Sequence, residues 1–238
     1  FWGDAKNKID ERPFAKLIAN RYKTDHEVLR IEVEEVLKLL PKLIWHLEEP
    51  FADAAFVPTY LISRLAQSKV KVLLNGAGGD ELFGGYPRYR NLTLMQKFKD
   101  IKSSLFPKTK NEWSFYKNTM VGEEMNWAQI FPFYSRFPHK DEIEKFFYKN
   151  LDKSYINSMM LNDINVYLKD DILFMLDKMT MACSIEGRVP LLDHRLVQKS
   201  LSIPPNFKIF SGQRKYVFNK TVEHLLPKKV IYRKKDGF

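Results

Sequence analysis

The stretch VKVLLNGAGGDELFGGY, residues 70–86, decides the fold of this chain. It begins as an apolar run, Val70–Leu74, that is rich in β-branched residues and typical of a buried parallel strand. The run ends in Asn-Gly-Ala-Gly-Gly, whose glycines let backbone N–H groups turn outward and approach an anion. Two acids, Asp80 and Glu81, follow at once. Because carboxylates beside such a loop repel phosphate unless a divalent cation bridges them, the stretch predicts a site for Mg²⁺ and a polyphosphate.

A solvated glycine-rich turn is the simpler interpretation of any isolated glycine cluster. Here the strand, the glycines and the paired acids follow one another in the order that an anion site needs, which favours such a site over a turn. In sheets of parallel strands, ligands bind at the carboxyl ends of the strands, and residues 75–81 fall there. The sequence therefore predicts a ligand site in this loop.

The residues that precede this stretch predict an α/β fold. Their apolar spacing predicts, in chain order, a helix begun by Asp10 with Pro13 in its first turn, a strand over 29–33, a helix over 36–47 and a helix over 58–66. Pro41 is expected to kink or split the second of these helices. Strands separated by helices in this order predict a sheet of parallel strands joined by crossovers.

The residues that follow Tyr86 predict a mainly helical part of the same domain. Helical spacing recurs over 91–106, 120–131, 154–186, 194–201 and 213–226. Nucleic-acid bases could stack on the many aromatic residues between 113 and 137, but the core of a helical subdomain explains these residues more simply. We therefore expect residues 1–90 to form the α/β part of the domain and residues 91–238 its helical part.

Composition narrows the class of protein. A chain of 238 residues with 45% hydrophobic residues is long enough for one substantial core. The single cysteine, Cys183, excludes an internal disulfide and favours a cytoplasmic location. No apolar run reaches the roughly 18 residues that span a bilayer, so no membrane partner is expected. The net charge of +10 is spread along the chain and interleaved with acids, so no nucleic-acid partner is expected either.

Four blocks of the sequence occur in the order found in asparagine synthetases. Residues 75–86, NGAGGDELFGGY, resemble the family pattern Ser-Gly-x-Gly-x-Asp-Glu-x-Phe-Gly-Gly-Tyr. Residues 169–193 resemble D-D-x-L-x-x-x-D-R-x-S-M-A-x-S-x-E-x-R-x-P-F-L-D, residues 48–64 resemble the helix start before the signature strand, and residues 233–238, RKKDGF, resemble R-x-K-x-G-F. The likeness runs from about Ile9 to Phe238. The first block departs from the pattern at Asn75, where the family has serine, and at Ala77, where many members have an acid.

The resemblance implies a parallel nucleotide-binding sheet of the adenine nucleotide alpha hydrolase type and a carbon–nitrogen ligase that uses ATP and Mg²⁺. In this family the side-chain carboxylate of aspartate attacks the α-phosphorus of ATP, and pyrophosphate leaves. Ammonia, taken from glutamine in the full-length enzyme, then displaces AMP and gives asparagine. The implied partners are therefore ATP, aspartate and ammonia or glutamine, and a homodimer is the oligomeric state to be tested.

The resemblance also implies roles for individual residues. The metal ligand would be Asp80, and the site for ATP and pyrophosphate would comprise Asn75, Gly76, Gly78, Gly79, Asp80 and Glu81. Lys235 matches the family's catalytic lysine, whereas without the resemblance it reads as a solvated lysine in a basic tail. Glu186 and Arg188 are counted with it as catalytic candidates that would hold the loop shaping the cleft, although an ion pair at a helix end explains them equally well.

Two parts of the family's pattern do not occur in this sequence. One is the Ser-Gly-Gly-x-Asp-Ser loop that holds the pyrophosphate, and the other is a glutaminase domain with a nucleophilic cysteine at its N-terminus. We therefore expect a partial synthetase domain that is inactive by itself and binds ATP weakly. Two alternatives stay open: a related ligase that acts on another carboxylate in glycan or peptide modification, and a truncated, non-catalytic binding module.

Overall fold

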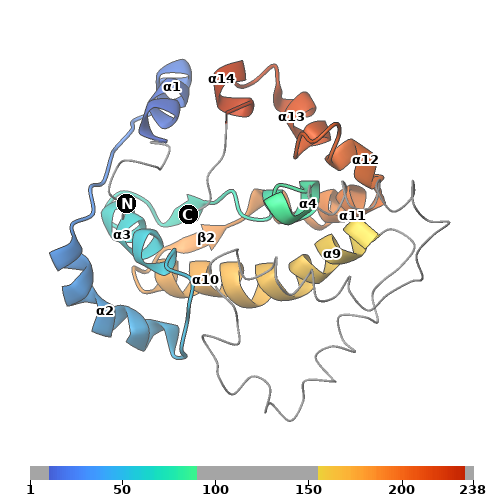
Figure 1. Ribbon diagram of the computed structural model, residues 1–238. Coiled ribbons are helices and arrows are strands. Elements are labelled where there is room, and N and C mark those ends of the chain that lie inside the picture. The colour runs from blue at the N-terminus through green and yellow to red at the C-terminus, as the bar shows by residue number, and fades with distance from the viewer. Residues whose placement is uncertain (1–10, 90–154, 234–238) are drawn as a thin grey trace, which may run out of the picture. The chain divides into compact units, whose positions relative to one another are not determined.

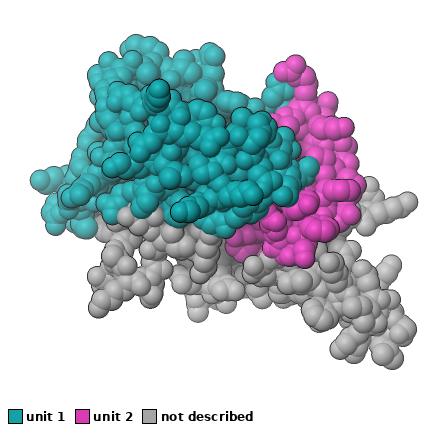
Figure 2. Space-filling view, turned by 90° about the horizontal axis from the view of Figure 1, so that it is seen from above, with its two compact units in different colours: residues 1–78, 166–194, 217–238 teal, residues 79–165, 195–216 magenta. Residues whose placement is uncertain are grey.

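The computed structural model describes residues 11–89 and 155–233, in which helices predominate (Figure 1). The chain divides into two compact units whose segments alternate along the sequence (Figure 2). Unit 1 comprises residues 1–78, 166–194 and 217–238, and unit 2 comprises residues 79–165 and 195–216. Within the described ranges, no helix is both long and apolar enough to cross a membrane.

The elements are distributed unevenly between the units. Unit 1 holds the helices α1 (Arg12–Tyr22), α2 (Val33–Leu47), α3 (Phe56–Ala66), α10 (Phe174–Met181) and α14 (Lys228–Ile231), the 3₁₀-helix η3 (Pro190–Leu192), and the strands β1 (Val72–Leu74) and β2 (Glu186–Arg188). Unit 2 holds the helices α4 (Gly79–Phe83), α9 (Tyr155–Asp163) and α12 (Pro205–Lys208). The π-helix η2 (Ile164–Leu173) and the helices α11 (His194–Ser202) and α13 (Tyr216–Val222) contain residues of both units.

The sheet of unit 1 consists of β1 and β2, which run parallel. Val72 pairs with Glu186 and Leu74 with Arg188, and Asn75 N donates to Arg188 O at 2.8 Å just past the end of β1. The α/β class is confirmed, and the sheet is parallel, but β1 pairs with β2 and not with the strand predicted over 29–33. The predicted burial of the strand is wrong, because Leu74 is 73% exposed and only Leu73 packs against the core. The strand therefore alternates between a packed and an exposed side.

The core of unit 1 lies among α2, α3 and α10. Residues Val36, Leu43 and Leu47 of α2 are fully or almost fully buried, at the helical spacing that the sequence predicts. They are joined in the core cluster by Phe56, Val57, Tyr60 and Leu61 of α3, by Met175 and Met179 of α10, and by Cys183 and Ile185. Pro41 does not split α2, which is continuous through this exposed residue.

The strand predicted over 29–33 is wrong. Residues 24–32 have no regular structure, and Val33 begins α2. Leu29 and Ile31 still pack against the core, so their alternation does mark a buried side. An extended segment becomes a strand only when a neighbour accepts and donates its backbone hydrogen bonds. Among the described residues, β1 and β2 pair only with each other, and this segment pairs with neither.

The helix predicted over 154–186 ends earlier than expected. Its last helical residue is Met181, and Ser184 then adopts a left-handed conformation with φ of 54°. This turn redirects the chain into β2, so Glu186 and Arg188 lie on a strand and not at a helix end. The sequence prediction missed β2, because three residues reading Glu-Gly-Arg have no strand propensity and are recruited by pairing with β1.

Several other predicted elements are confirmed with small shifts. The helix with Pro13 in its first turn is α1, the helix predicted over 58–66 is α3, and the helix over 194–201 is α11. The helix predicted over 213–226 is shorter and corresponds to α13. The predicted cap at Asp10 and the helices predicted over 91–106 and 120–131 lie outside the described residues.

Candidate functional site

The loop after β1 is shaped by a local turn and by one obligatory glycine. Ala77 N donates to Asn75 Oδ1 at 2.8 Å, which fixes a tight turn directly past the strand. Gly78 has φ of +87°, and a Cβ at this position would overlap the side chain of Leu192 in η3. Gly76, in contrast, faces open space. The loop therefore has an accessible backbone at Gly76 and a fixed course at Gly78, both at the carboxyl end of a parallel strand.

The helix α4 begins directly after this loop and directs its two acids to different partners. Successive residues of a helix point about 100° apart. Asp80 forms an ion pair with Lys215, with Oδ1 and Nζ 3.0 Å apart and the two side chains 21% and 20% exposed. Glu81 is buried and accepts a hydrogen bond from the Tyr86 hydroxyl. The acids therefore lie in two distinct environments within unit 2.

Lys215 and its neighbour Arg214 were not recognised from the sequence. Arg214 Nη1 donates to Gly85 O at 2.8 Å, and a Cβ on Gly85 would overlap both Asp80 and the Lys215 side chain. Gly85, the second glycine of the pair that follows α4, is thus needed for the close approach of Lys215 to Asp80. No local pattern around 214–215 signals this contact, because its partners lie far away in the sequence.

The residues present fit a magnesium ion that is held largely by a phosphate ligand. Mg²⁺ usually binds through one or two carboxylates together with waters and substrate phosphates. Asp80 is a single, partly exposed carboxylate. In the described part of the chain, no group of three or more His, Cys, Asp or Glu side chains could hold a metal ion by itself. Asp80 can therefore contribute to such a site but does not form it alone.

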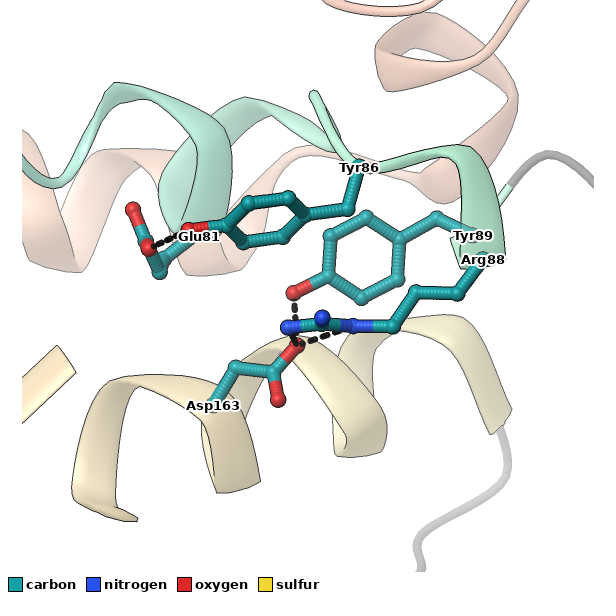
Figure 3. Close-up of polar contacts among 5 residues, drawn as sticks. All are labelled: Glu81, Tyr86, Arg88, Tyr89 and Asp163. Atoms are coloured by element: carbon teal, nitrogen blue, oxygen red, sulfur yellow. Dashed lines mark hydrogen bonds and ion pairs between the residues drawn. The ribbon is translucent and has the colours of Figure 1, made fainter. Parts of the chain in front are cut away.

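Glu81 belongs to a buried polar cluster in unit 2 (Figure 3). The carboxylate of Asp163, on α9, accepts from Arg88 Nη2 at 2.8 Å, from Arg88 Nε at 3.3 Å and from the Tyr89 hydroxyl. The guanidinium of Arg88 lies 4.1 Å from the centroid of the Tyr86 ring, and Tyr86 donates in turn to Glu81. The segment that follows α4 is thus anchored to α9 by an ion pair and hydrogen bonds to Asp163.

Burial sets the protonation of this cluster. It raises the pKa of Glu81 above its usual range, although the hydrogen bond from Tyr86 acts in the opposite direction. Burial opposes the charged form of Arg88, but the charge and hydrogen bond of Asp163 together with the two neighbouring tyrosines outweigh it, and the pKa of Arg88 is raised. Burial and the adjacent carboxylate raise the pKa of Tyr89 well above its usual value. Tyr89 therefore stays a neutral donor and Arg88 stays charged.

A second buried cation lies in unit 2. Lys208, the last residue of α12, is fully buried, and its Nζ lies 3.2 Å from Asn157 Oδ1 and 3.9 Å from Met160 Sδ on α9. Burial lowers the pKa of Lys208 to about 8. Neither of these two partners is an acid, so neither compensates the charge of Lys208.

The other candidates lie apart from these contacts. Glu186 and Arg188 form an ion pair along one face of β2, with Oε1 and Nε 2.8 Å apart and the side chains 57% and 61% exposed. This is the structural ion pair that the sequence left as an alternative. The mutual hydrogen bond lowers the pKa of Glu186 and raises that of Arg188. Lys235 lies outside the described residues.

Asp171 gives a prediction about pH. Burial, and then the charge of Asp53, raises the pKa of Asp171 to about 6, and its buried Oδ1 accepts no hydrogen bond from the described residues. The stabilising effect of its protonated form is present in full below about pH 4 and is lost as the pH rises through 6. We expect Asp171→Asn to raise the free energy of unfolding at pH 7.5 by about 2 kcal/mol and to change it little at pH 4.

Urea denaturation at the two pH values measures this difference. The matched control is Asp177→Asn, an exposed carboxylate on the neighbouring helix α10, for which we expect no pH-dependent gain. An equal effect of Asp171→Asn at both pH values would show that ionisation of Asp171 is not its cause.

The chain is similar to known proteins over almost its whole length. A family model described as asparagine synthase matches residues 2–238. Over 87% of its own length, the chain is 34% identical to asparagine synthetase [glutamine-hydrolyzing] 1 of Bacillus subtilis. Over the same share of its own length, it is 30% identical to a putative asparagine synthetase of Mycobacterium bovis. A rice asparagine synthetase is 25% identical over 94% of the chain. The matched regions are 37%, 35% and 30% of these relatives, so the chain spans about a third of their length.

Proposed function

Because the chain belongs to the asparagine synthase family, we propose that the complete protein joins ammonia to the side-chain carboxylate of aspartate at the expense of ATP. The products are asparagine, AMP and pyrophosphate, and the ammonia comes from glutamine. The observation that supports this best is the loop of residues 75–78, which carries the family's glycines at the carboxyl end of β1. Since the chain spans about a third of the length of its relatives, this activity is proposed for the complete protein.

The phosphates of ATP are proposed to bind along the continuous segment 75–81. The backbone N–H groups of Gly76, Gly78 and Gly79 and the side-chain amide of Asn75 are the donors. Gly76 faces open space where a side chain would stand, which suits close approach of a phosphate. Glu81 is proposed to support the phosphate site indirectly. Its buried carboxylate accepts a hydrogen bond from the Tyr86 hydroxyl, and this bond holds the first residues of the segment after α4.

In unit 2 Asp80 is proposed to hold Mg²⁺, which when bound neutralises charge on the departing pyrophosphate. Lys215 now balances the charge of Asp80, and Arg214 lies beside it on Gly85 O. With Mg²⁺ on the Asp80 carboxylate, the ammonium group of Lys215 would be a hydrogen-bond donor for a phosphate oxygen.

Lys235 is proposed as the cation that stabilises negative charge on the acyl-adenylate while the amide forms. Glu186 and Arg188 are proposed to brace the segment that leads from β2 to η3, through the ion pair that they form along one face of the strand.

Pyrophosphate release from Mg-ATP by the protein expressed from its complete gene tests the function. We expect release that requires aspartate and ammonium and yields asparagine. Release with a different carboxylate, from a glycan or a peptide, would replace aspartate as the substrate. Absence of release with every carboxylate tested would leave a binding module without the proposed chemistry.

The pair Asp80–Lys215 gives a second test. We expect Asp80→Asn to raise the Mg²⁺ concentration for half-maximal pyrophosphate release about tenfold or more, because the carboxylate that holds the ion is lost. Lys215→Gln is expected to raise the KM for ATP, whereas the control Lys199→Gln, an exposed lysine on α11, leaves it unchanged. An unchanged Mg²⁺ requirement in the Asp80→Asn variant would remove the metal assignment.

A further inference from the structure

The helix α4 ends in a turn that folds back onto Asp80. Gly84 adopts a left-handed conformation with φ of +72°, and Gly85 N donates to Asp80 O at 2.8 Å. This combination is a Schellman motif, in which the second residue past a helix bonds to a carbonyl of the last helical turn. Gly85 is buried, and the Asp80 carboxylate lies where a Cβ of Gly85 would stand. The position of Gly85 therefore decides where the Asp80 carboxylate can lie.

A second tight turn lies within residues 208–215. Phe210 and Gln213 exchange two backbone hydrogen bonds, of 3.1 and 2.8 Å. Both residues between them are left-handed, Ser211 with φ of 48° and Gly212 with φ of 80°. Two left-handed central residues are typical of a type I′ turn, which keeps the chain on its two sides close together. The segments before and after this turn therefore reach the same part of unit 2.

The segment before the type I′ turn packs against Gly84. Ile209 is 3% exposed, and a Cβ on Gly84 would lie 3.2 Å from Ile209 Cγ1 and 3.7 Å from Lys208 Cβ. The first of these distances is shorter than an ordinary van der Waals contact between carbon atoms, so a side chain at position 84 would press on Ile209. The two turns are therefore packed closely against each other in unit 2.

The segment after the type I′ turn brings two cations to the end of α4. Arg214 Nη1 donates to Gly85 O at 2.8 Å, a hydrogen bond that the charge of the donor strengthens. Lys215 is itself left-handed, with φ of 53°, and its Nζ lies 3.0 Å from Asp80 Oδ1. Residues other than glycine keep this conformation only where the surrounding structure holds them in it. Gly85 is thus bonded through its N–H to Asp80 and through its C=O to Arg214.

We propose that Arg214 is a positioning residue for Asp80, which it fixes through Gly85. This inference rests on the proposed function, because Asp80 is the metal ligand of that reaction. Mg²⁺ demands a nearly octahedral arrangement of its ligands, and groups that orient a ligand from behind raise the affinity for the metal. Without Arg214, the freedom of a glycine backbone would pass to the carboxylate that lies against it.

Hydrogen–deuterium exchange tests the fixation of Gly85 in the complete protein, without metal or ATP. We expect Arg214→Ala to speed exchange of the Gly85 amide about tenfold or more, because the carbonyl of the same residue is released. Arg214→Lys keeps a charged donor and should stay closer to the wild type. The matched control is Arg30→Ala, an exposed arginine before α2, for which this exchange stays unchanged. Unchanged exchange in the Arg214→Ala variant would overturn the proposal.

The Mg²⁺ requirement of pyrophosphate release tests the positioning of Asp80. We expect Arg214→Ala to raise the Mg²⁺ concentration for half-maximal release about fivefold or more, with kcat recovered at saturating Mg²⁺ and the KM for aspartate unchanged. Arg214→Lys should restore part of the Mg²⁺ affinity. In the Asp80→Asn background, Arg214→Ala should add less than about twofold, because both changes act through one carboxylate.

A general structural defect gives a different pattern. It would lower kcat even at saturating Mg²⁺, or add in full to the effect of Asp80→Asn, and either result would overturn the positioning role of Arg214. If the wild-type protein releases no pyrophosphate with any carboxylate, the proposed function itself fails, and the positioning role falls with it. If the wild type is active and Arg214→Ala leaves the Mg²⁺ requirement unchanged, the function stands and only this inference is overturned.

Discussion

Replacing Asp163 by alanine is expected to lower the free energy of unfolding of unit 2 by about 3–5 kcal/mol. The variant leaves the guanidinium of Arg88 buried without the carboxylate that it contacts through Nη2 and Nε. It also removes the acceptor of the buried Tyr89 hydroxyl. The loss of a carboxylate partner by a buried charge and by a buried donor costs more than the net gain of the contacts that are lost.

Native-state hydrogen exchange of α4 and α9 over a series of urea concentrations measures this loss. The matched control is Asp170→Ala, whose carboxylate is 57% exposed and paired with the neighbouring Lys169, and which we expect to change stability by less than about 0.5 kcal/mol. The double variant Arg88→Met, Asp163→Ala should lose less than the sum of the single variants, because the charge is removed together with its partner. A loss below about 1 kcal/mol for Asp163→Ala would show that the cluster is not a stabilising one.

Lys235→Ala is expected to lower kcat for amide synthesis about 10²- to 10³-fold, with little change in the KM for ATP. A charge that acts mainly in the transition state contributes to kcat and little to the binding of the ground state. Lys235→Arg keeps the charge and should retain a measurable part of the activity.

The neighbouring Lys234 provides the control for this variant, since Lys234→Ala makes the same change one residue earlier. Steady-state measurement of pyrophosphate and asparagine together separates loss of the adenylation step from loss of amide formation. Amide synthesis that is intact in Lys235→Ala would exclude Lys235 as the catalytic cation, whatever the outcome for the rest of the site.

The sequence predicted local features of the fold better than long-range ones. The strand that ends at Leu74 and the turn that begins at Asn75 follow from neighbouring residues, and both are present. The strand predicted over 29–33 and the unpredicted β2 show the limit of this approach. Pairing decides whether an extended segment is a strand, and the pairing partner is not encoded in the segment itself.

The same limit applies to the candidate site. Adjacent acids at 80 and 81 suggested one shared environment, whereas the helical geometry of α4 directs Asp80 to Lys215 and Glu81 to Tyr86. Lys215 could not be found from the sequence alone, because its contact with Asp80 depends on the course of the chain between them. The sequence shows a glycine at position 85, but only the structure shows why glycine is needed there. The side chains of Asp80 and Lys215 come close together at the place where a Cβ would stand.

Chemical labelling of Lys208, the buried lysine of α12, can measure how often unit 2 opens. An amine-selective acylating reagent needs direct access to Nζ, and Lys208 has no exposed surface. Acylation of Lys208 should therefore proceed only through molecules in which α12 has separated from α9, while the exposed Lys199 of α11 reacts at once. The ratio of the two labelling rates, measured by mass spectrometry, gives the free energy of that opening. The same ratio measures how much a ligand that binds unit 2 stabilises its closed form.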